Sequence, residues 1–440
     1  MLQKKKIFYL IYEIEYRDFL PRLLISLSLA KENNYVFMIT FNKFKKIYNF
    51  LPKGVVLFHN LSVAKKKIYE KVLTKHKGSF FHEEPFQIYE NYIDSSVIYE
   101  KDLLNKMEFV SCLSRFHKKK IDNYAEKKVK TIVHGFPKMD LSSKKYDYLF
   151  EENVKKIKEK YKNIIFIPSN FHFATYRLMN NDKYWYDKKI NRFKNNKNKK
   201  ELKKYIEQDI KINKHKNHVL KEYILAINNL SKIFPNYTFV IRPHPGDHPL
   251  FWQKMFNAKN IKVIFKYDVK TWIHSSILSL NHWCTSSIES YFQNKNAICY
   301  LPHFNKNLDT NFYSNIYDKA FNFKSLKNII QKRLLKRKKF KKGLLKKYIK
   351  HTDNSSIDLI ASDLNKIKIS KNNLLYPRFL FFFLNLSTFF LNFLKTSDQK
   401  TKEKFKWPNK SFVFFKKILK TKKYSDQKIV KIGSEIYLIK

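Results

Sequence analysis

Residues 236–247 read Asn-Tyr-Thr-Phe-Val-Ile-Arg-Pro-His-Pro-Gly-Asp, and we expect the rest of the chain to be organised around this stretch. Its apolar, β-branched run predicts a buried strand that ends at Arg242 and passes into a turn-rich loop. Two prolines restrict the backbone around His244, so we expect this histidine on a stiff, non-helical segment. An ordinary strand exit and a ligand-binding tip both fit this stretch alone.

Short apolar runs alternate with helical patterns on both sides of this stretch. Helical spacing is found over residues 18–31, 219–233 and 269–274, and a further helix is expected to open at Ile288. Such alternation indicates a parallel sheet covered by helices on both faces. We therefore predict an α/β fold with two doubly wound, Rossmann-like domains that face a central cleft, the ligand lying at the carboxyl ends of the strands. The remaining strands are expected near residues 6–12, 36–40, 55–59, 79–81, 108–113, 130–133, 163–170, 261–265, 277–280 and 297–301.

The domain boundaries follow from changes in composition. A turn-rich segment at 135–140 and a polar stretch after it place the first domain at residues 1–150 and the second at 160–365. Residues 180–218 are rich in Lys and Asn with weak periodicity, and we expect a mobile insertion there. Residues 370–440 form an amphipathic and basic C-terminal extension rich in aromatic residues.

Composition limits the possible partners and the compartment. The chain has 440 residues, 44% of them hydrophobic, and a formal net charge of +52, which favours an anionic substrate or an anionic membrane surface. A basic nucleic-acid-binding protein is the alternative, but the lysines are spread along the whole chain, and no specific nucleic acid is expected. Cys112, Cys284 and Cys299 lack C-x-x-C spacing, as in a reducing cytoplasm. Charged residues follow the first apolar run at once, which favours a first strand over a signal peptide.

Residues 374–394 are long enough to span a bilayer, which takes about 20 residues. Arg378, Asn385 and Asn392 recur on one face, however, and a transmembrane span would expose this polar stripe to lipid. The segment is thus an amphipathic helix, which lies on a membrane surface or packs across the two domains. The basic, aromatic residues 395–423 favour contact with anionic lipid.

A second loop at a strand exit carries three hydroxyl groups, at Thr285, Ser286 and Ser287. Hydroxyls before a helix are typical of an N-cap, and the same geometry binds phosphate. This loop and His244 should emerge at one edge of one sheet, where they could hold the phosphate of a nucleotide-activated donor. Arg242 could add charge-assisted bonds. Glu289 could accept from ribose hydroxyls or simply compensate the helix dipole.

In the first domain, Glu83 and Glu84 follow a predicted strand. Two adjacent carboxylates repel, which can raise one pKa and suit that group to deprotonate an acceptor hydroxyl, although such pairs are often only solvated. The sequence contains neither G-x-G-x-x-G nor a phosphate-binding P-loop, which disfavours dehydrogenases and P-loop ATPases. No D-x-D triplet occurs, and prolines forbid the helix that would align His244 with His248, so we expect no metal and no cofactor.

Several motifs together resemble a known family. Arg242-Pro243-His244-Pro245, followed by the loop at 285–287, is similar to the His-Pro and Ser-Ser motifs of GT-B glycosyltransferases that use CMP- or CDP-activated donors, such as capsule Kdo-linker, sialyl- and polyol-phosphate transferases. The chain also resembles the bacterial surface carbohydrate biosynthesis protein family from about residue 6 to about residue 407. That resemblance rests on Glu13, Arg17, Glu83-Glu84, Gly135-Phe136-Pro137-Lys138-Met139-Asp140, Asn170-Phe171 and Lys404-Phe405.

The resemblance implies a metal-independent glycosyltransferase acting on a cell-surface polysaccharide precursor, with a polyol-phosphate transferase or a non-catalytic scaffold as alternatives. The first domain would bind a glycan or lipid-linked glycan acceptor and the second the nucleotide-sugar donor. His244, with Pro245 beside it, would hydrogen-bond or protonate the leaving phosphate, Ser286 and Ser287 would cradle it, and Glu83 or Glu84 would activate the acceptor. The protein would act in the cytoplasm, peripherally at the inner face of the plasma membrane.

Overall fold

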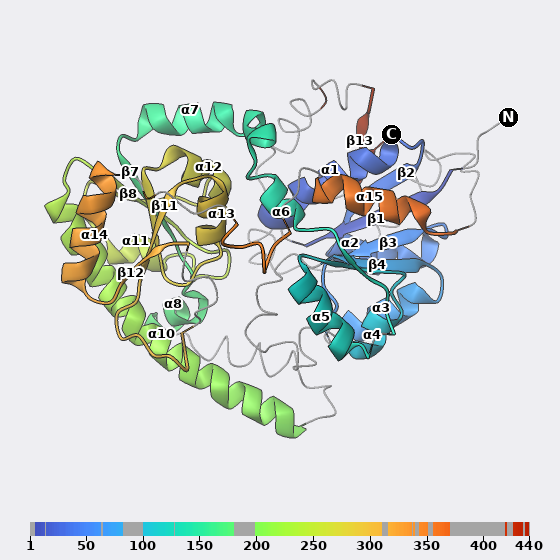
Figure 1. Cartoon of the computed structure of the whole chain (residues 1–440), viewed down its shortest axis with the longest axis horizontal. Coiled ribbons are helices and arrows are strands. Elements are labelled where there is room, and N and C mark those ends of the chain that lie inside the picture. The colour runs from blue at the N-terminus through green and yellow to red at the C-terminus, as the bar shows by residue number, and fades with distance from the viewer. Residues whose placement is uncertain are drawn as a thin grey trace, which may run out of the picture. The chain divides into compact units, whose positions relative to one another are not determined.

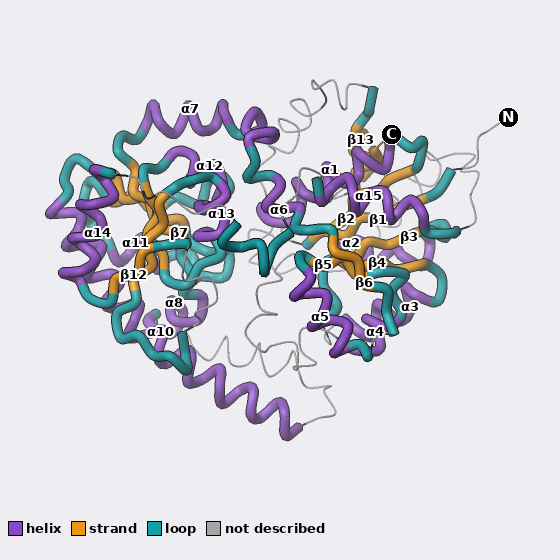
Figure 2. Tube along the Cα trace, viewed as in Figure 1, coloured by secondary structure: helices purple, strands orange, loops and turns teal. Residues whose placement is uncertain are grey.

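The computed structural model describes residues 5–13, 15–62, 65–81, 100–126, 128–179, 199–309, 316–336, 338, 343–350, 355–369, 419, 426–433 and 436–439. The chain divides into two compact units. Unit 1 comprises Met1–Leu141 and Leu345–Lys440, and unit 2 comprises Ser142–Leu344. Each unit contains a sheet flanked by helices (Figures 1 and 2).

The sheet of unit 1 has eight strands among the described residues, in the order β13-β14-β2-β1-β3-β4-β5-β6. The six strands from β2 to β6 are parallel, and the β13–β14 hairpin adds to β2 in antiparallel orientation. The strands of the unit are β1 (Ile7–Tyr12), β2 (Tyr35–Thr40), β3 (Val55–Phe58), β4 (Lys77–Phe81), β5 (Val110–Cys112), β6 (Thr131–Val133), β13 (Ile429–Gly433) and β14 (Ile436–Ile439).

The helices of unit 1 cover both faces of this sheet, and a π-helical turn, η1, precedes the first of them. Their bounds are η1 (Glu15–Phe19), α1 (Leu20–Ala30), α2 (Phe41–Ile47), η2 (Tyr48–Phe50), α3 (Lys66–Leu73), α4 (Lys101–Asn105), α5 (Arg115–Tyr124), α6 (Pro137–Asp140) and α15 (Ser356–Lys366).

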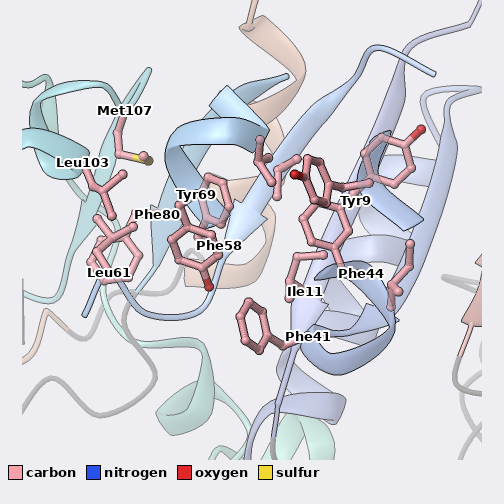
Figure 3. Close-up of a cluster of buried hydrophobic side chains, with 14 of the residues drawn as sticks. Tyr9, Ile11, Phe41, Phe44, Phe58, Leu61, Tyr69, Phe80, Leu103 and Met107 are labelled. Carbon is pink, nitrogen blue, oxygen red and sulfur yellow. The ribbon is translucent and has the colours of Figure 1, made fainter. Parts of the chain in front are cut away.

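One face of this sheet carries a dense aromatic core. Tyr9 and Phe44 from β1 and α2, and Phe58 and Tyr69 from β3 and α3, meet on it (Figure 3). The rings of Phe58 and Tyr69 lie 4.3 Å apart, and all four residues are at most 1% exposed. Burial of this apolar surface holds β1 and β3 together at the centre of the unit.

The sheet of unit 2 is parallel throughout, in the order β12-β11-β10-β7-β8-β9. Its strands β7, β8 and β11 are almost wholly buried and largely apolar, as expected of a sheet covered on both faces. The elements are η6 (Lys144–Leu149), α7 (Glu151–Lys160), β7 (Ile164–Pro168), α8 (His172–Leu178), α10 (Lys199–Ile233), β8 (Thr238–Arg242), α11 (Phe251–Met255), β9 (Ile261–Val263), α12 (Val269–Ser275), β10 (Leu278–Asn281), α13 (Ser286–Phe292), β11 (Asn296–Tyr300), β12 (Asp318–Ala320) and α14 (Phe323–Leu335).

The two Rossmann-like α/β units confirm the predicted fold class. The second half of the insertion expected at 180–218 is helical, because α10 begins at Lys199 and continues for 35 residues, and the expected mobility stays a prediction. Lys, Glu, Leu and Gln in that half have good helix propensity, which outweighs the weak periodicity. Residues 180–198 lie outside the described part of the chain.

The C-terminal boundary also differs from the expectation. We predicted that residues 160–365 form one domain, but α15 belongs to unit 1, where it lies beside α1 (Figure 1). Asp140 at the end of α6 receives hydrogen bonds from the Ser355 and Ser356 hydroxyls and the Ile357 amide, at 3.1–3.2 Å. Gly135 has a φ of 103°, and a Cβ there would lie 2.5 Å from Ser356 Oγ. The segment 135–140 therefore binds residues 355–357, where the chain returns to unit 1 and α15 begins.

Candidate functional site

Three loops meet at one edge of the unit 2 sheet. They follow β7, β8 and β10, and β7 lies between the other two strands. The three strands are parallel, so their carboxyl ends share one edge. From β7 the chain continues to β8 on one side and later returns to β10 on the other. This strand order makes the β7–β10 gap a topological switch point, where open α/β sheets bind their ligands.

The loop after β8 fixes the protonation pattern of His244. The Gly246 amide donates a hydrogen bond to His244 Nδ1 at 2.9 Å, and the Asp247 amide donates to the His244 carbonyl at 2.9 Å. Because Nδ1 accepts a hydrogen bond, a neutral His244 carries its proton on Nε2. The side chain is therefore oriented as an Nε2–H donor.

Asp247 holds this loop from beneath. Its Oδ2 accepts from the His244 amide at 3.0 Å and from Trp252 Nε1 at 2.7 Å, and the residue is 4% exposed. Burial raises the pKa of the Asp247 carboxyl to about 6, although these two hydrogen bonds favour the charged form. The described residues contain no group of three or more His, Cys, Asp or Glu side chains placed to hold a metal ion.

We expect Asp247→Asn to change the pH dependence of stability. The pKa of Asp247 is about 6 in the folded chain, above its ordinary value of 3.8. Its contribution to folding is therefore greatest below about pH 4 and is lost as the pH rises through about 6. From pH 4 to 7.5 the wild type should lose about 1–3 kcal/mol that the variant retains. Urea unfolding of both proteins across this range measures the difference, and parallel stability curves would contradict it.

His172 was not predicted from the sequence, yet its ring stacks on His244. The ring centroids lie 3.8 Å apart with an interplanar angle of 20°. His172 begins α8, a few residues after β7 ends, so adjacent parallel strands deliver both imidazoles. Gly246 makes this approach possible, because a Cβ there would lie 3.1 Å from His244 Nδ1 and 3.3 Å from His172 Nδ1. The available signal was position: each histidine follows a buried strand by a few residues.

Arg242 has a structural role in the loop after β9. It is 8% exposed, and its Nε donates to the Tyr267 carbonyl at 3.1 Å. Tyr267 has a φ of 70°, which is uncommon for a bulky residue and is held here by that bond. The predicted phosphate contact of Arg242 stays a prediction.

The three hydroxyls after β10 differ from one another. Thr285 has a helical backbone and makes no side-chain cap, so the N-cap interpretation is wrong, and α13 begins at Ser286 rather than Ile288. Ser287 Oγ donates to Asn281 Oδ1 at 3.1 Å. Ser286 Oγ is buried and has no hydrogen-bond partner among the described residues. An orphan buried hydroxyl costs free energy unless a ligand or water satisfies it.

Asn170 ties this loop to the one after β7. Its Nδ2 donates to the Trp283 carbonyl at 3.0 Å and to the His282 carbonyl at 3.3 Å. Trp283 has a φ of 45°, in the left-handed region. The loop around Ser286 is thus fixed from both sides of the switch point.

Glu289 is 4% exposed in the first turn of α13 and lies near a buried lysine on α12. Lys270 is 5% exposed, and burial lowers its pKa to about 8, while Asp147, Asp268 and Glu289 act in the opposite direction. The ribose contact of Glu289 stays a prediction.

A surface cavity of about 590 Å³ between α7 and α12 is lined by Asp147, His274 and other residues, none of them predicted for the site.

Three predicted features lie outside the described residues: the Glu83–Glu84 pair, the amphipathic segment 374–394 and, apart from residue 419, the basic, aromatic segment 395–423. Of the helices that the structure describes, none combines the length and the apolar character needed to cross a membrane.

No family model and no curated protein matches the sequence. Similar solved structures include UDP-GlcNAc 2-epimerase of Methanocaldococcus jannaschii in complex with UDP-GlcNAc and UDP, with 13% identity, a TM-score of 0.49, and coverage of 82% of this chain and 99% of that chain. A variant of the wall teichoic acid polymerase TagF has 10% identity and a TM-score of 0.48, and the match covers 83% of this chain and 89% of that chain. MnaA of S. aureus with UDP has 10% identity and a TM-score of 0.47, and the match covers 83% of this chain and 100% of that chain.

Proposed function

We propose that this protein is a metal-independent glycosyltransferase that moves a sugar from a CMP- or CDP-activated donor to a cell-surface polysaccharide precursor. The observation that carries the proposal is the orientation of His244 at the switch-point edge. The Gly246 amide donates to Nδ1, so the neutral ring carries its own N–H group on Nε2. A donor fixed before the reaction stabilises negative charge that develops on a departing phosphate without having to reorganise.

Ser286 supports the same proposal. Its hydroxyl is buried at this edge and has no partner within the described residues. A phosphate oxygen would accept from it and remove the cost of an unsatisfied polar group. Ser287 is already bonded to Asn281, so its part in the proposed cradle is to hold the loop rather than to bind phosphate.

The acceptor side of the proposal rests on the sequence. Glu83 or Glu84 would deprotonate the acceptor hydroxyl, and a glycan or lipid-linked glycan would be the acceptor. The basic, aromatic residues 395–423 favour an anionic membrane surface, so the protein would work peripherally at the cytoplasmic face of the membrane.

Titration of the wild type with CMP, CDP and UDP tests the proposed donor. We expect CMP or CDP to bind and to stabilise the fold, by about 2.7 kcal/mol at a concentration of 100 times Kd. UDP should bind more weakly, and no binding of any of the three would overturn the proposal. Calorimetry gives the affinities, and thermal unfolding gives the stabilisation.

Ser286→Ala should separate ligand binding from folding. The variant loses a hydroxyl that has no hydrogen-bond partner in the described part of the chain, so its unfolding free energy should stay within about 0.5 kcal/mol of the wild type or rise. Its affinity for the cytidine nucleotide should fall about tenfold. Ser290→Ala is the matched control, because Ser290 Oγ donates to the Ser286 carbonyl at 3.0 Å. That variant should lose stability and keep its affinity, and the opposite pattern would remove Ser286 from the site.

A further inference from the structure

A second polar cluster lies at the carboxyl edge of the unit 1 sheet. The chain runs from β1 to β2 on one side and then to β3 on the other, so the β1–β3 gap is the switch point of this sheet. Glu13 follows β1 there, and His59 and Asn60 follow β3. Lys65 comes immediately before α3. The predicted site contains none of these residues.

Among the residues that the structure describes, the polar contacts of the Glu13 carboxylate all involve one oxygen. Oε2 accepts from Lys65 Nζ at 3.0 Å, lies 3.0 Å from His59 Nε2, and accepts from Asn60 Nδ2 at 3.4 Å. Within the described residues, Oε1 has no hydrogen bond or ion pair. The Glu13 side chain is 32% exposed, whereas those of Lys65 and His59 are 11% and 0% exposed. Of these three side chains, the Glu13 carboxylate is thus the one that reaches furthest toward solvent.

The backbone around Glu13 is fixed as firmly as its side chain. The Glu13 amide donates to Asp18 Oδ2 at 3.1 Å, and Asp18 is fully buried and paired with Arg17. Asp18 lies in the π-helical turn η1, a rare conformation that is frequent at functional sites. Lys65 is held in turn by Phe41, with its Nζ 4.1 Å from the ring centroid.

The electrostatics of the cluster favour binding over proton transfer. Burial alone would raise the pKa of Glu13, but His59 and Lys65 outweigh it and hold that pKa well below its usual range. Burial lowers the pKa of His59 to about 4, so this imidazole is neutral. Its Nε2 lies 2.7 Å from Lys65 Nζ as well as 3.0 Å from Glu13 Oε2, so it adds no positive charge to the cluster. A carboxylate with so low a pKa accepts hydrogen bonds but is a weak base. The charges of Glu13 and Lys65 cancel, which suits an uncharged ligand.

We propose that Glu13 Oε1 binds a hydroxyl group of a neutral, polyhydroxylated ligand at the switch point of unit 1. If the proposed function holds, this ligand is the sugar acceptor, and Glu13 positions it without taking its proton. A partly exposed carboxylate, fixed through its other oxygen by three side chains, is already oriented to accept that bond.

Direct binding of defined sugars tests this site without any nucleotide. The probes are glucose, N-acetylglucosamine and glycerol as neutral ligands, with galacturonate and glucosamine as charged controls. Saturation-transfer NMR on the full chain yields a Kd for each probe. We expect at least one neutral probe to bind, and Glu13→Gln to weaken it about tenfold or more, because bonds to charged groups are the stronger ones.

Glu108→Gln is the matched control, since Glu108 has 35% side-chain exposure and pairs only with Lys77 at 3.1 Å among the described residues. This variant should bind the probes as the wild type does. The proposal is overturned if no neutral probe binds, if Glu13→Gln binds as tightly as the wild type, or if only glucosamine binds, which would indicate a cation site.

CMP and CDP affinities of Glu13→Gln separate this proposal from the proposed function. They should equal the wild-type values, because the proposed nucleotide site lies in unit 2 and Glu13 lies in unit 1. Urea unfolding of Glu13→Gln shows that unit 1 of the variant is folded. If the wild type binds neither CMP nor CDP but binds a sugar in a Glu13-dependent way, the proposed nucleotide donor is refuted and the sugar site is supported. The reverse result would refute only the sugar site.

Discussion

Replacing His244 with alanine is expected to lower turnover by about 10²–10⁴-fold, the range typical of a positioned acid or hydrogen-bond donor. The variant removes the Nε2–H group that the Gly246 amide orients. Stability should change little, because the side chain is only half-buried and the Asp247 bond to the backbone amide remains. The turnover is measured as release of nucleotide from an activated donor that carries the nucleotide bound in the titrations. Urea unfolding gives the stability.

His248→Ala is the control for this prediction. His248 lies on the same loop, is half-buried, and has its ring 5.0 Å from that of Tyr176. Its loss should leave turnover within a few-fold of the wild type. Wild-type turnover in His244→Ala would remove His244 from the chemistry, and equal losses in both variants would indicate a general disturbance of the loop.

Arg22→Met is expected to destabilise unit 1 by about 2–5 kcal/mol, the largest effect on folding that we predict. The Arg22 guanidinium is fully buried on α1 and donates to the carbonyls of Leu57 and Phe58 at 2.9 and 3.1 Å, and to that of Phe81 at 3.5 Å. Methionine keeps most of the apolar volume, so the cost should come from the unsatisfied carbonyls. Chemical denaturation of both proteins measures this difference.

The same substitution at Arg115 is the control. Arg115 is exposed in the first turn of α5, so Arg115→Met should change the unfolding free energy by no more than about 0.5 kcal/mol. A similar small change in Arg22→Met would mean that water replaces the guanidinium at the ends of β3 and β4.

The loops after β8 and β10 could be located from the sequence because the residues next to each strand end are typical of loops. A β-branched run followed by Pro-His-Pro predicts the end of a strand, whatever the rest of the fold. His172 carries no such mark, because its relation to His244 depends on β7 and β8 being neighbours in the sheet. The single-oxygen anchoring of Glu13 likewise needs β1, β3 and the residue before α3 brought together.

The return of the chain to unit 1 also escaped prediction. The Ser28 hydroxyl donates to Asp358, and His134 pairs with Asp363 at 2.9 Å, contacts that join residues more than two hundred positions apart. Local periodicity carries no information about such distant partners. The β13–β14 hairpin, by contrast, could have been predicted from the sequence, since Gly433-Ser434 separates two apolar runs.

The C-terminal hairpin has a consequence for the order in which the protein folds on the ribosome. Unit 2 is contiguous, so its core can close once Leu344 has emerged. Unit 1 begins first but must wait for α15 and for β14, whose residues 436–439 pair with β2. Until then β2 is an open, apolar edge, the kind of strand that recruits chaperones or aggregates. The first part of the chain to be synthesised is therefore the last to reach its native state.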